Sequence, residues 1–234
     1  MMTEKRFLFL GNSHTYFNDM PALLQKFCIE GNFCKAEVSM LAFPYKTYRD
    51  HLKMETSLRY AMLYGKFDYL IMQQAAHKPC PDKEETLETG EEIIRLAREQ
   101  NICPVQIVPW AEKAYPEHQA GIDEIYEELH DQTGVKLIPL GRVFSTLSLC
   151  EGMPDLYWKD GEHASPWGSY AAAAVIYASL SGKSPEGLSE TSLVFAKDSD
   201  SRGQKDWRST PYPLEKEMCR ILQRTVWSII SEEK

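Results

Sequence analysis

The 234-residue sequence contains neither a long hydrophobic run nor a cluster of basic residues. A membrane-spanning helix needs about 20 consecutive apolar residues, so we expect no membrane partner. Non-specific binding to nucleic acid requires a clustered basic face. Here 26 Lys and Arg residues stand against 34 Asp and Glu residues, for a formal charge of −8. The composition therefore argues against nucleic acid as a partner.

The six cysteines form no CxxC pair and show no Cys/His spacing typical of zinc sites. Cys28 and Cys34 are close in sequence, and reduced thiols in the core are the favoured interpretation. Near the N-terminus, only the four apolar residues 7–10 separate Lys5-Arg6 from a polar segment. A secretory signal has an apolar stretch of about 7–15 residues. We therefore expect a cytoplasmic protein, while the sequence leaves its oligomeric state open.

Strand-like and helix-like segments alternate along the chain, which is typical of a parallel sheet covered by helices on both faces. A hydrophobic content of 43% is ordinary for a globular domain. The sequence predicts one α/β domain over residues 1–234, with about five parallel strands. The predicted strands are Arg6–Gly11, Lys35–Leu41, Phe67–Gln73, Ile102–Pro109 and Val135–Leu140.

Three helices are indicated by apolar spacing or by capping residues. Ile122, Ile125, Tyr126 and Leu129 recur at i, i+3, i+4 and i+7. Ser165-Pro166 places a hydroxyl at an N-cap and a proline at the first helical position, and this helix should end near Gly182. A last helix is predicted at about 213–231. We expect residues 196–213 to form a polar surface loop, and the acidic residues of 82–92 and 117–131 to form solvated helix faces.

The first predicted strand ends in Gly11-Asn12-Ser13-His14-Thr15. Ligands of open α/β sheets gather beyond the carboxyl ends of the strands. Since the next helix is expected to begin only around Asp19-Met20-Pro21, the backbone N–H of Ser13 would be free beside its hydroxyl. A nucleophile with an oxyanion donor at the same residue is what acyl transfer requires, although many serines at this position are only local caps.

A second feature lies in the loop before the helix capped by Ser165. Asp160 and His163 are three residues apart, with Gly161 between them. In a compact turn the Asp160 carboxylate can accept a hydrogen bond from Nδ1–H of His163, which leaves Nε2 as a base for a serine hydroxyl. Two alternatives stay open. Both side chains could tie up backbone groups, or they could form half of a metal site with His14 or His77.

These two blocks, Gly11-Asn12-Ser13-His14 and Asp160-Gly161-Glu162-His163-Ala164-Ser165-x-x-Gly168, resemble those of the SGNH (GDSL-like) hydrolase superfamily. The resemblance extends over about residues 6–180. It implies a flavodoxin-like, three-layer α/β/α sandwich and a Ser-His-Asp esterase mechanism without a cofactor. By this resemblance Ser13 is the nucleophile, His163 the base and Asp160 its orienting carboxylate.

The middle blocks depart from the family pattern. The family usually has an oxyanion-donating glycine after the second strand, where this chain has Ala42-Phe43-Pro44-Tyr45. Proline has no N–H, so a backbone donor there would come from Phe43 or Tyr45. After the third strand Gln73 stands where the family has asparagine, as in a divergent branch, and we expect its amide to join the N–H of Ser13 in the oxyanion hole. Gln74 is the fallback.

Four further residues are predicted near the same edge of the sheet and are candidate substrate contacts: His14, Tyr45, His77 and Trp110. Aromatic faces beside polar groups suit carbohydrate or mixed ligands, but they also suit packing beneath loops. The expected function is hydrolysis of small acyl (acetyl-type) oxygen esters of a small molecule such as a carbohydrate. The alternative is a non-catalytic carbohydrate- or metabolite-binding protein on the same fold, because the glycine of the second block is missing.

Overall fold

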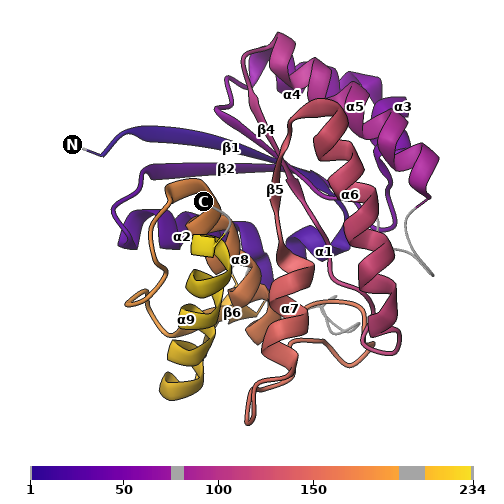
Figure 1. The fold of residues 1–234 in the computed structure, drawn as a ribbon. Coiled ribbons are helices and arrows are strands. Elements are labelled where there is room, and N and C mark those ends of the chain that lie inside the picture. The colour runs from indigo at the N-terminus through magenta and orange to yellow at the C-terminus, as the bar shows by residue number, and fades with distance from the viewer. Residues whose placement is uncertain (1, 75–81, 195–208, 233–234) are drawn as a thin grey trace, which may run out of the picture.

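The fold is built on a five-stranded sheet in which every neighbouring pair of strands is parallel. The computed structural model describes residues 2–74, 82–194 and 209–232. The strand order is β2-β1-β3-β4-β5, as in flavodoxin-like sheets, which confirms the predicted architecture (Figure 1). The strands are β1 (Glu4–Gly11), β2 (Lys35–Ala42), β3 (Tyr69–Met72), β4 (Cys103–Ile107) and β5 (Lys136–Ile138).

Strand β1 lies inside the sheet and buries side chains on both of its faces. Successive side chains of a strand point to opposite faces. Phe7 and Phe9 accordingly belong to one hydrophobic cluster, while Leu8 and Leu10 belong to the other. All four side chains are at most 1% exposed. The continuous apolar run 7–10 therefore forms a strand that is covered by hydrophobic residues on both faces of the sheet.

Helices cover both faces of the sheet and complete the three layers (Figure 1). One layer contains α2 (Met20–Glu30), α7 (Leu140–Ser148), α8 (Pro166–Ser181) and α9 (Lys216–Glu232). The other contains α3 (Tyr48–Lys53), α4 (Glu55–Tyr64), α5 (Lys83–Glu99) and α6 (Gln119–Thr133). The short elements α1 (Ser13–Tyr16) and η1 (Phe17–Asp19) connect β1 to α2, and η2 (Pro116–His118) precedes α6.

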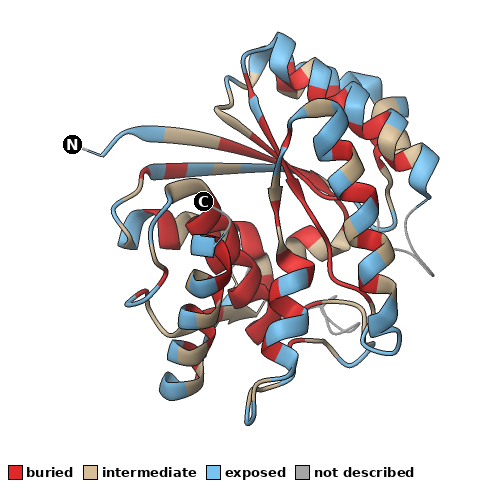
Figure 2. Cartoon of the chain, in the orientation of Figure 1, coloured by how far each residue is buried: buried red, intermediate tan, exposed pale blue. Residues whose placement is uncertain are grey.

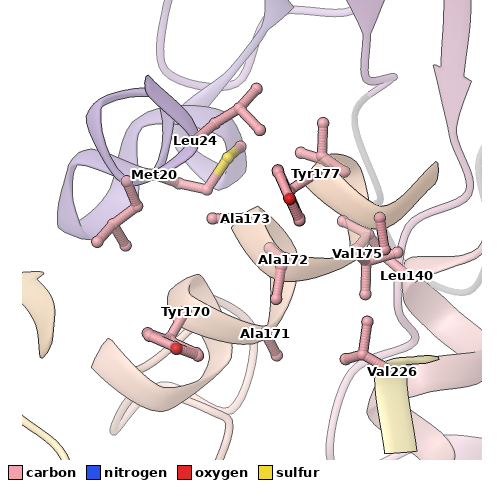
Figure 3. Packing of buried hydrophobic residues seen from close by; sticks show 14 of the residues in the cluster. Met20, Leu24, Leu140, Tyr170, Ala171, Ala172, Ala173, Val175, Tyr177 and Val226 are labelled. Atoms are coloured by element: carbon pink, nitrogen blue, oxygen red, sulfur yellow. The ribbon is translucent and has the colours of Figure 1, made fainter. Parts of the chain in front are cut away.

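Helix α8 lies at the centre of its layer and is buried on every side (Figures 2 and 3). All residues from Pro166 to Ser179 are buried, and the helix contacts α2, α7 and α9. The alanines 171–174 leave room for these neighbours, with Met20 and Leu24 of α2 packed nearby. The predicted start is confirmed, because the Ser165 hydroxyl accepts a hydrogen bond from the N–H of Gly168 at 3.2 Å.

The structure corrects the sequence prediction in two regions. Helices α3, α4 and α7 were not predicted. Part of the expected polar loop is a strand, since β7 (Thr210–Pro213) pairs antiparallel with β6 (Thr191–Val194) in a separate ribbon. Residues 196–208 of that loop lie outside the described parts. Helix α9 begins at Lys216, because the chain up to Pro213 is used by β7.

The acidic segments lie on α5 and α6, whose outer faces are largely exposed (Figure 2). This agrees with the predicted solvated helix faces. Within the described parts of the chain, no helix has both the length and the apolar character needed to cross a membrane. Cys28 and Cys34 are buried thiols without a disulfide. Burial raises the pKa of Cys28, which makes that thiol a poor nucleophile.

Candidate active site

The candidate site lies where the strand order reverses. Strand β1 has β2 on one side and β3 on the other. The connections leaving β1 and β3 therefore diverge at their carboxyl ends, and ligands of doubly wound sheets bind at such a switch point. Ser13 stands two residues after β1, and Gln73 directly follows β3. Gln73 also donates its backbone N–H to the carbonyl of Leu10 at 2.9 Å, which holds the two strand ends together.

Ser13 is the first residue of a one-turn helix, α1, and this corrects the prediction that helical structure begins only near Asp19. Asn12 is the N-cap, and its side chain accepts a hydrogen bond from the N–H of His14 at 3.1 Å. The N–H of a first helical residue has no partner within its own helix. The Ser13 N–H therefore points out of the N-terminus of α1, where it can donate to an oxyanion.

The imidazole of His163 bridges Ser13 and Asp160. Its Nε2 lies 2.8 Å from Oγ of Ser13, and its Nδ1 lies 2.8 Å from Oδ2 of Asp160. With a neutral ring, Nδ1–H donates to the carboxylate and Nε2 accepts from the hydroxyl. The His163 side chain is 17% exposed. The predicted catalytic residues, 150 positions apart, are thus brought together.

The loop that carries Asp160 and His163 is fixed by its own backbone. Gly161 has a φ of +75°, a left-handed conformation that favours glycine. The other carboxylate oxygen of Asp160 accepts the backbone N–H groups of Glu162 and His163 at 2.9 and 3.0 Å. Burial raises the pKa of Asp160, but these hydrogen bonds and that from His163 outweigh it, so the pKa lies below its usual value. Asp160 is therefore ionised at neutral pH.

Gln73 is 2% exposed and uses only half of its amide group. Its Oε1 accepts a hydrogen bond from the hydroxyl of Thr15 at 2.8 Å. Among the described residues its buried Nε2 has no hydrogen-bond partner. An unpaired buried donor costs about 1–3 kcal/mol, so a ligand acceptor at Nε2 would be stabilising. Gln74, the fallback, accepts from Tyr48 N–H and donates to Thr86, which engages both ends of its amide.

The loop after β2 limits the choice of a further backbone donor. The N–H of Phe43 donates to the carbonyl of Gly11 at 3.3 Å, so that group is already used. Tyr45 has a φ of +62°, which is unusual for a bulky side chain, and it is 78% exposed. Outliers of this kind cluster at functional sites. Tyr45 therefore stays a candidate for substrate contact.

The other predicted contacts have different outcomes. The ring of His14 stacks on that of His163, with centroids 4.6 Å apart. Trp110 is 3% exposed, stacks on Phe144 and donates its indole N–H to the carbonyl of Glu162 at 2.8 Å. Trp110 therefore stabilises the loop that carries His163. This corrects the prediction that Trp110 contacts substrate. His77 lies outside the described residues.

Sequence reasoning missed three residues that hold the site together. Thr15 orients Gln73 as described above. Phe17 stacks on His163, with ring centroids 4.2 Å apart. Asn18 donates its side-chain amide to the loop after His163. All three follow Ser13 within five positions, so closeness to the nucleophile was the one available signal. Within the described parts of the chain, no group of three His, Cys, Asp or Glu residues could hold a metal ion.

Comparisons with known proteins extend this result. No family model matches the chain, and no curated protein matches its sequence. Solved structures do match. A DUF4886 family protein from Bacteroides uniformis has a TM-score of 0.66 at 14% identity, covering 99% of this chain and 97% of its own. A protein from Slackia heliotrinireducens assigned to the SGNH hydrolases has a TM-score of 0.65 at 23% identity, covering 75% and 98%.

An acetyl xylan esterase, AlAXEase, also matches, with a TM-score of 0.62 at 17% identity, covering 75% of this chain and 99% of its own. At these identities the comparison establishes the architecture. This chain has the three-layer α/β/α fold of the SGNH hydrolases.

Proposed function

We propose that this chain is a serine esterase that hydrolyses small acyl oxygen esters by a Ser-His-Asp mechanism. The observation that carries the proposal is the hydrogen-bonded chain from Ser13 through His163 to Asp160 at the switch point of the sheet. The fold shared with an acetyl xylan esterase and with an assigned SGNH hydrolase supports it.

In the proposed reaction, Oγ of Ser13 attacks the ester carbonyl while Nε2 of His163 takes the hydroxyl proton. Ionised Asp160 stabilises the imidazolium through Nδ1–H. His163 then gives the proton to the leaving alcohol as the ester C–O bond breaks, which produces an acyl-serine. Water, deprotonated by the same imidazole, attacks the acyl-serine, and the acid leaves as the proton returns to Ser13. No cofactor takes part in these steps.

The developing oxyanion needs donors that are in place before the reaction. We assign this role to the N–H of Ser13 and to Nε2 of Gln73. Supporting observations are the helix N-terminal position of Ser13 and the buried, unpaired Nε2 of Gln73. A two-donor hole would compensate for the missing glycine of the second block, where the Phe43 N–H is used by Gly11.

The direct test is turnover of p-nitrophenyl acetate by the Ser13→Ala variant. We expect hydrolysis to fall by at least about 10³-fold, since the nucleophile is lost. Ser39→Ala is the matched control, because Ser39 is an exposed serine of β2 outside the site. Equal turnover by wild type and Ser13→Ala would refute the esterase. Binding of an acetylated sugar without Ser13-dependent turnover would instead favour the non-catalytic alternative.

For the substrate, we propose an acetyl ester whose alcohol is a carbohydrate, with the exposed ring of Tyr45 contacting the sugar. Aromatic rings beside polar groups suit sugar faces. The Tyr45→Ala variant should lose kcat/KM on acetylated xylooligosaccharides by about 10-fold or more and keep it on p-nitrophenyl acetate. Equal losses on both esters, or no loss on either, would argue against a sugar contact at Tyr45.

A further inference from the structure

The segment that follows the proposed nucleophile holds the proposed base by more than the Ser13 hydrogen bond. Rings of His14 and Phe17 both stack on the imidazole of His163, with planes inclined by 23° and 21°. Asp160 fixes the edge of the imidazole that carries Nδ1. The relative position of nucleophile and base therefore depends on how segment 13–18 is joined to the loop 160–165.

Asn18 lies at the end of this segment in an unusual backbone conformation. Its φ and ψ are +51° and +28°, and the following residue, Asp19, is also left-handed with a φ of +55°. Two successive non-glycine residues in this region are uncommon, although Asn and Asp tolerate it best. Asn18 is only 4% exposed, so the strained turn is buried rather than set at the surface. Surrounding contacts must hold it in place.

The side chain of Asn18 supplies those contacts. Its Nδ2 donates to the carbonyl of Ala164 and to the hydroxyl oxygen of Ser169, both at 2.9 Å. The Ser169 hydroxyl in turn donates to the carbonyl of Phe17 at 3.3 Å. Ala164 directly follows His163, and Ser169 lies in the first turn of α8. The amide of Asn18 thus joins segment 13–18 both to the backbone next to His163 and to the first turn of α8.

We infer that Asn18 is a positioning residue for ester hydrolysis, which fixes the loop of His163 relative to Ser13. The inference rests on the proposed function. Asn18 touches neither the reacting atoms nor a substrate, and it acts through the Ala164 carbonyl and the ring of the adjacent Phe17. Catalysis requires reacting atoms about 3–3.5 Å apart, and a displacement of 1 Å can lower the rate about 10²-fold. Loss of the Asn18 amide should therefore lower kcat without removing any catalytic group.

The test uses Asn18→Gly, because glycine keeps the left-handed backbone and removes only the amide. We expect kcat for p-nitrophenyl acetate to fall about 30- to 100-fold, with KM changed less than about 3-fold. Asn32→Gly is the matched control. Asn32 has the same φ of +51°, but it is exposed. It lies just before the amino end of β2, whereas the candidate site lies at the carboxyl ends of the strands. This control should retain wild-type kcat.

A second readout separates positioning from folding. The Nδ1–H proton that His163 shares with Asp160 should give a downfield NMR signal in wild type and in Asn32→Gly, and it should be broadened or lost in Asn18→Gly. A kcat within 2-fold of wild type and an unchanged NMR signal in Asn18→Gly would overturn the inference. If Ser13→Ala is inactive in that case, the proposed esterase still stands. If Ser13→Ala is as active as wild type, the proposed function fails instead.

Discussion

At the scale of single residues, Gln73 divides its amide group between two tasks. Oε1 is occupied by the Thr15 hydroxyl, and this bond orients the amide and leaves Nε2 as a buried donor. The residue and its role were predicted from the resemblance to the SGNH hydrolases, which places an asparagine at this position after the third strand, and the role stays a prediction. The sequence could not predict the orientation, which depends on Thr15, 58 positions away. Likewise the hydrogen bond from Phe43 to Gly11 depends on the register of β1 and β2, which residue types alone do not reveal.

Gln73→Glu gives a sharp test of the oxyanion role. The carboxylate can still accept from Thr15, but it has no N–H and would repel an oxyanion. Loss of one oxyanion donor costs about 10²–10³-fold in kcat, so we expect a loss of at least 10²-fold, measured on p-nitrophenyl acetate. Gln73→Asn, which restores the amide in a shorter side chain, should recover part of the activity. Wild-type kcat in Gln73→Glu would exclude Gln73 from the oxyanion hole.

At the scale of elements, the long periodic segments and the capped helix were predicted, while short helices were missed. Helix α7 buries Leu140, Val143, Phe144 and Leu147, which follow the same i, i+3, i+4, i+7 spacing used to predict α6. That signal was present in the sequence. Helix α3 is also marked, by a capping box between Thr47 and Asp50. In contrast, β7 contains two prolines and only exposed residues, so its pairing with β6 is set by tertiary context.

Helix α8 should tolerate almost no increase in side-chain volume. Ala173 lies on α8 and is fully buried in the hydrophobic cluster, so Ala173→Val adds two methyl groups inside a packed core. Overpacking of this kind costs about 1–3 kcal/mol. We expect a loss of that size in the free energy of unfolding, measured with urea. Ala120→Val on α6, where the alanine is exposed, should cost well under 1 kcal/mol. Equal costs for both variants would mean that α8 is not tightly packed.

At the scale of the whole molecule, the two hydrophobic clusters lie on opposite faces of one sheet. Some polar groups near the switch point of this sheet are buried and form hydrogen bonds to the ends of its strands. His51 is one of these groups. It is 2% exposed, and its Nε2 lies 2.8 Å from the carbonyl of Gly11, at the end of β1. Because the carbonyl only accepts, Nε2 carries the proton and donates. Burial lowers the pKa of His51, although the bond to Gly11 opposes this effect.

This depressed pKa makes stability depend on pH in a defined direction. In the unfolded chain His51 becomes protonated near pH 6.5, whereas in the folded chain it becomes protonated only at lower pH. His51 therefore contributes stability above about pH 6.5, and this contribution is lost as the pH falls below that value. The free energy of unfolding, measured by urea titration, should therefore decrease as the pH is lowered below about 6.5. His51→Gln, a donor that does not titrate, should flatten the decrease. An unchanged slope in that variant would contradict the assignment.

The central claim, that Ser13 is a nucleophile activated by His163, is tested most directly by covalent labelling. A fluorophosphonate that reacts only with activated serines should add one phosphonyl group to the wild-type chain, and peptide mass spectrometry should place it on Ser13. His163→Ala should remain folded and lose the label, because the base that removes the Ser13 proton is absent. Labelling of a different serine, or undiminished labelling of Ser13 in His163→Ala, would contradict the account.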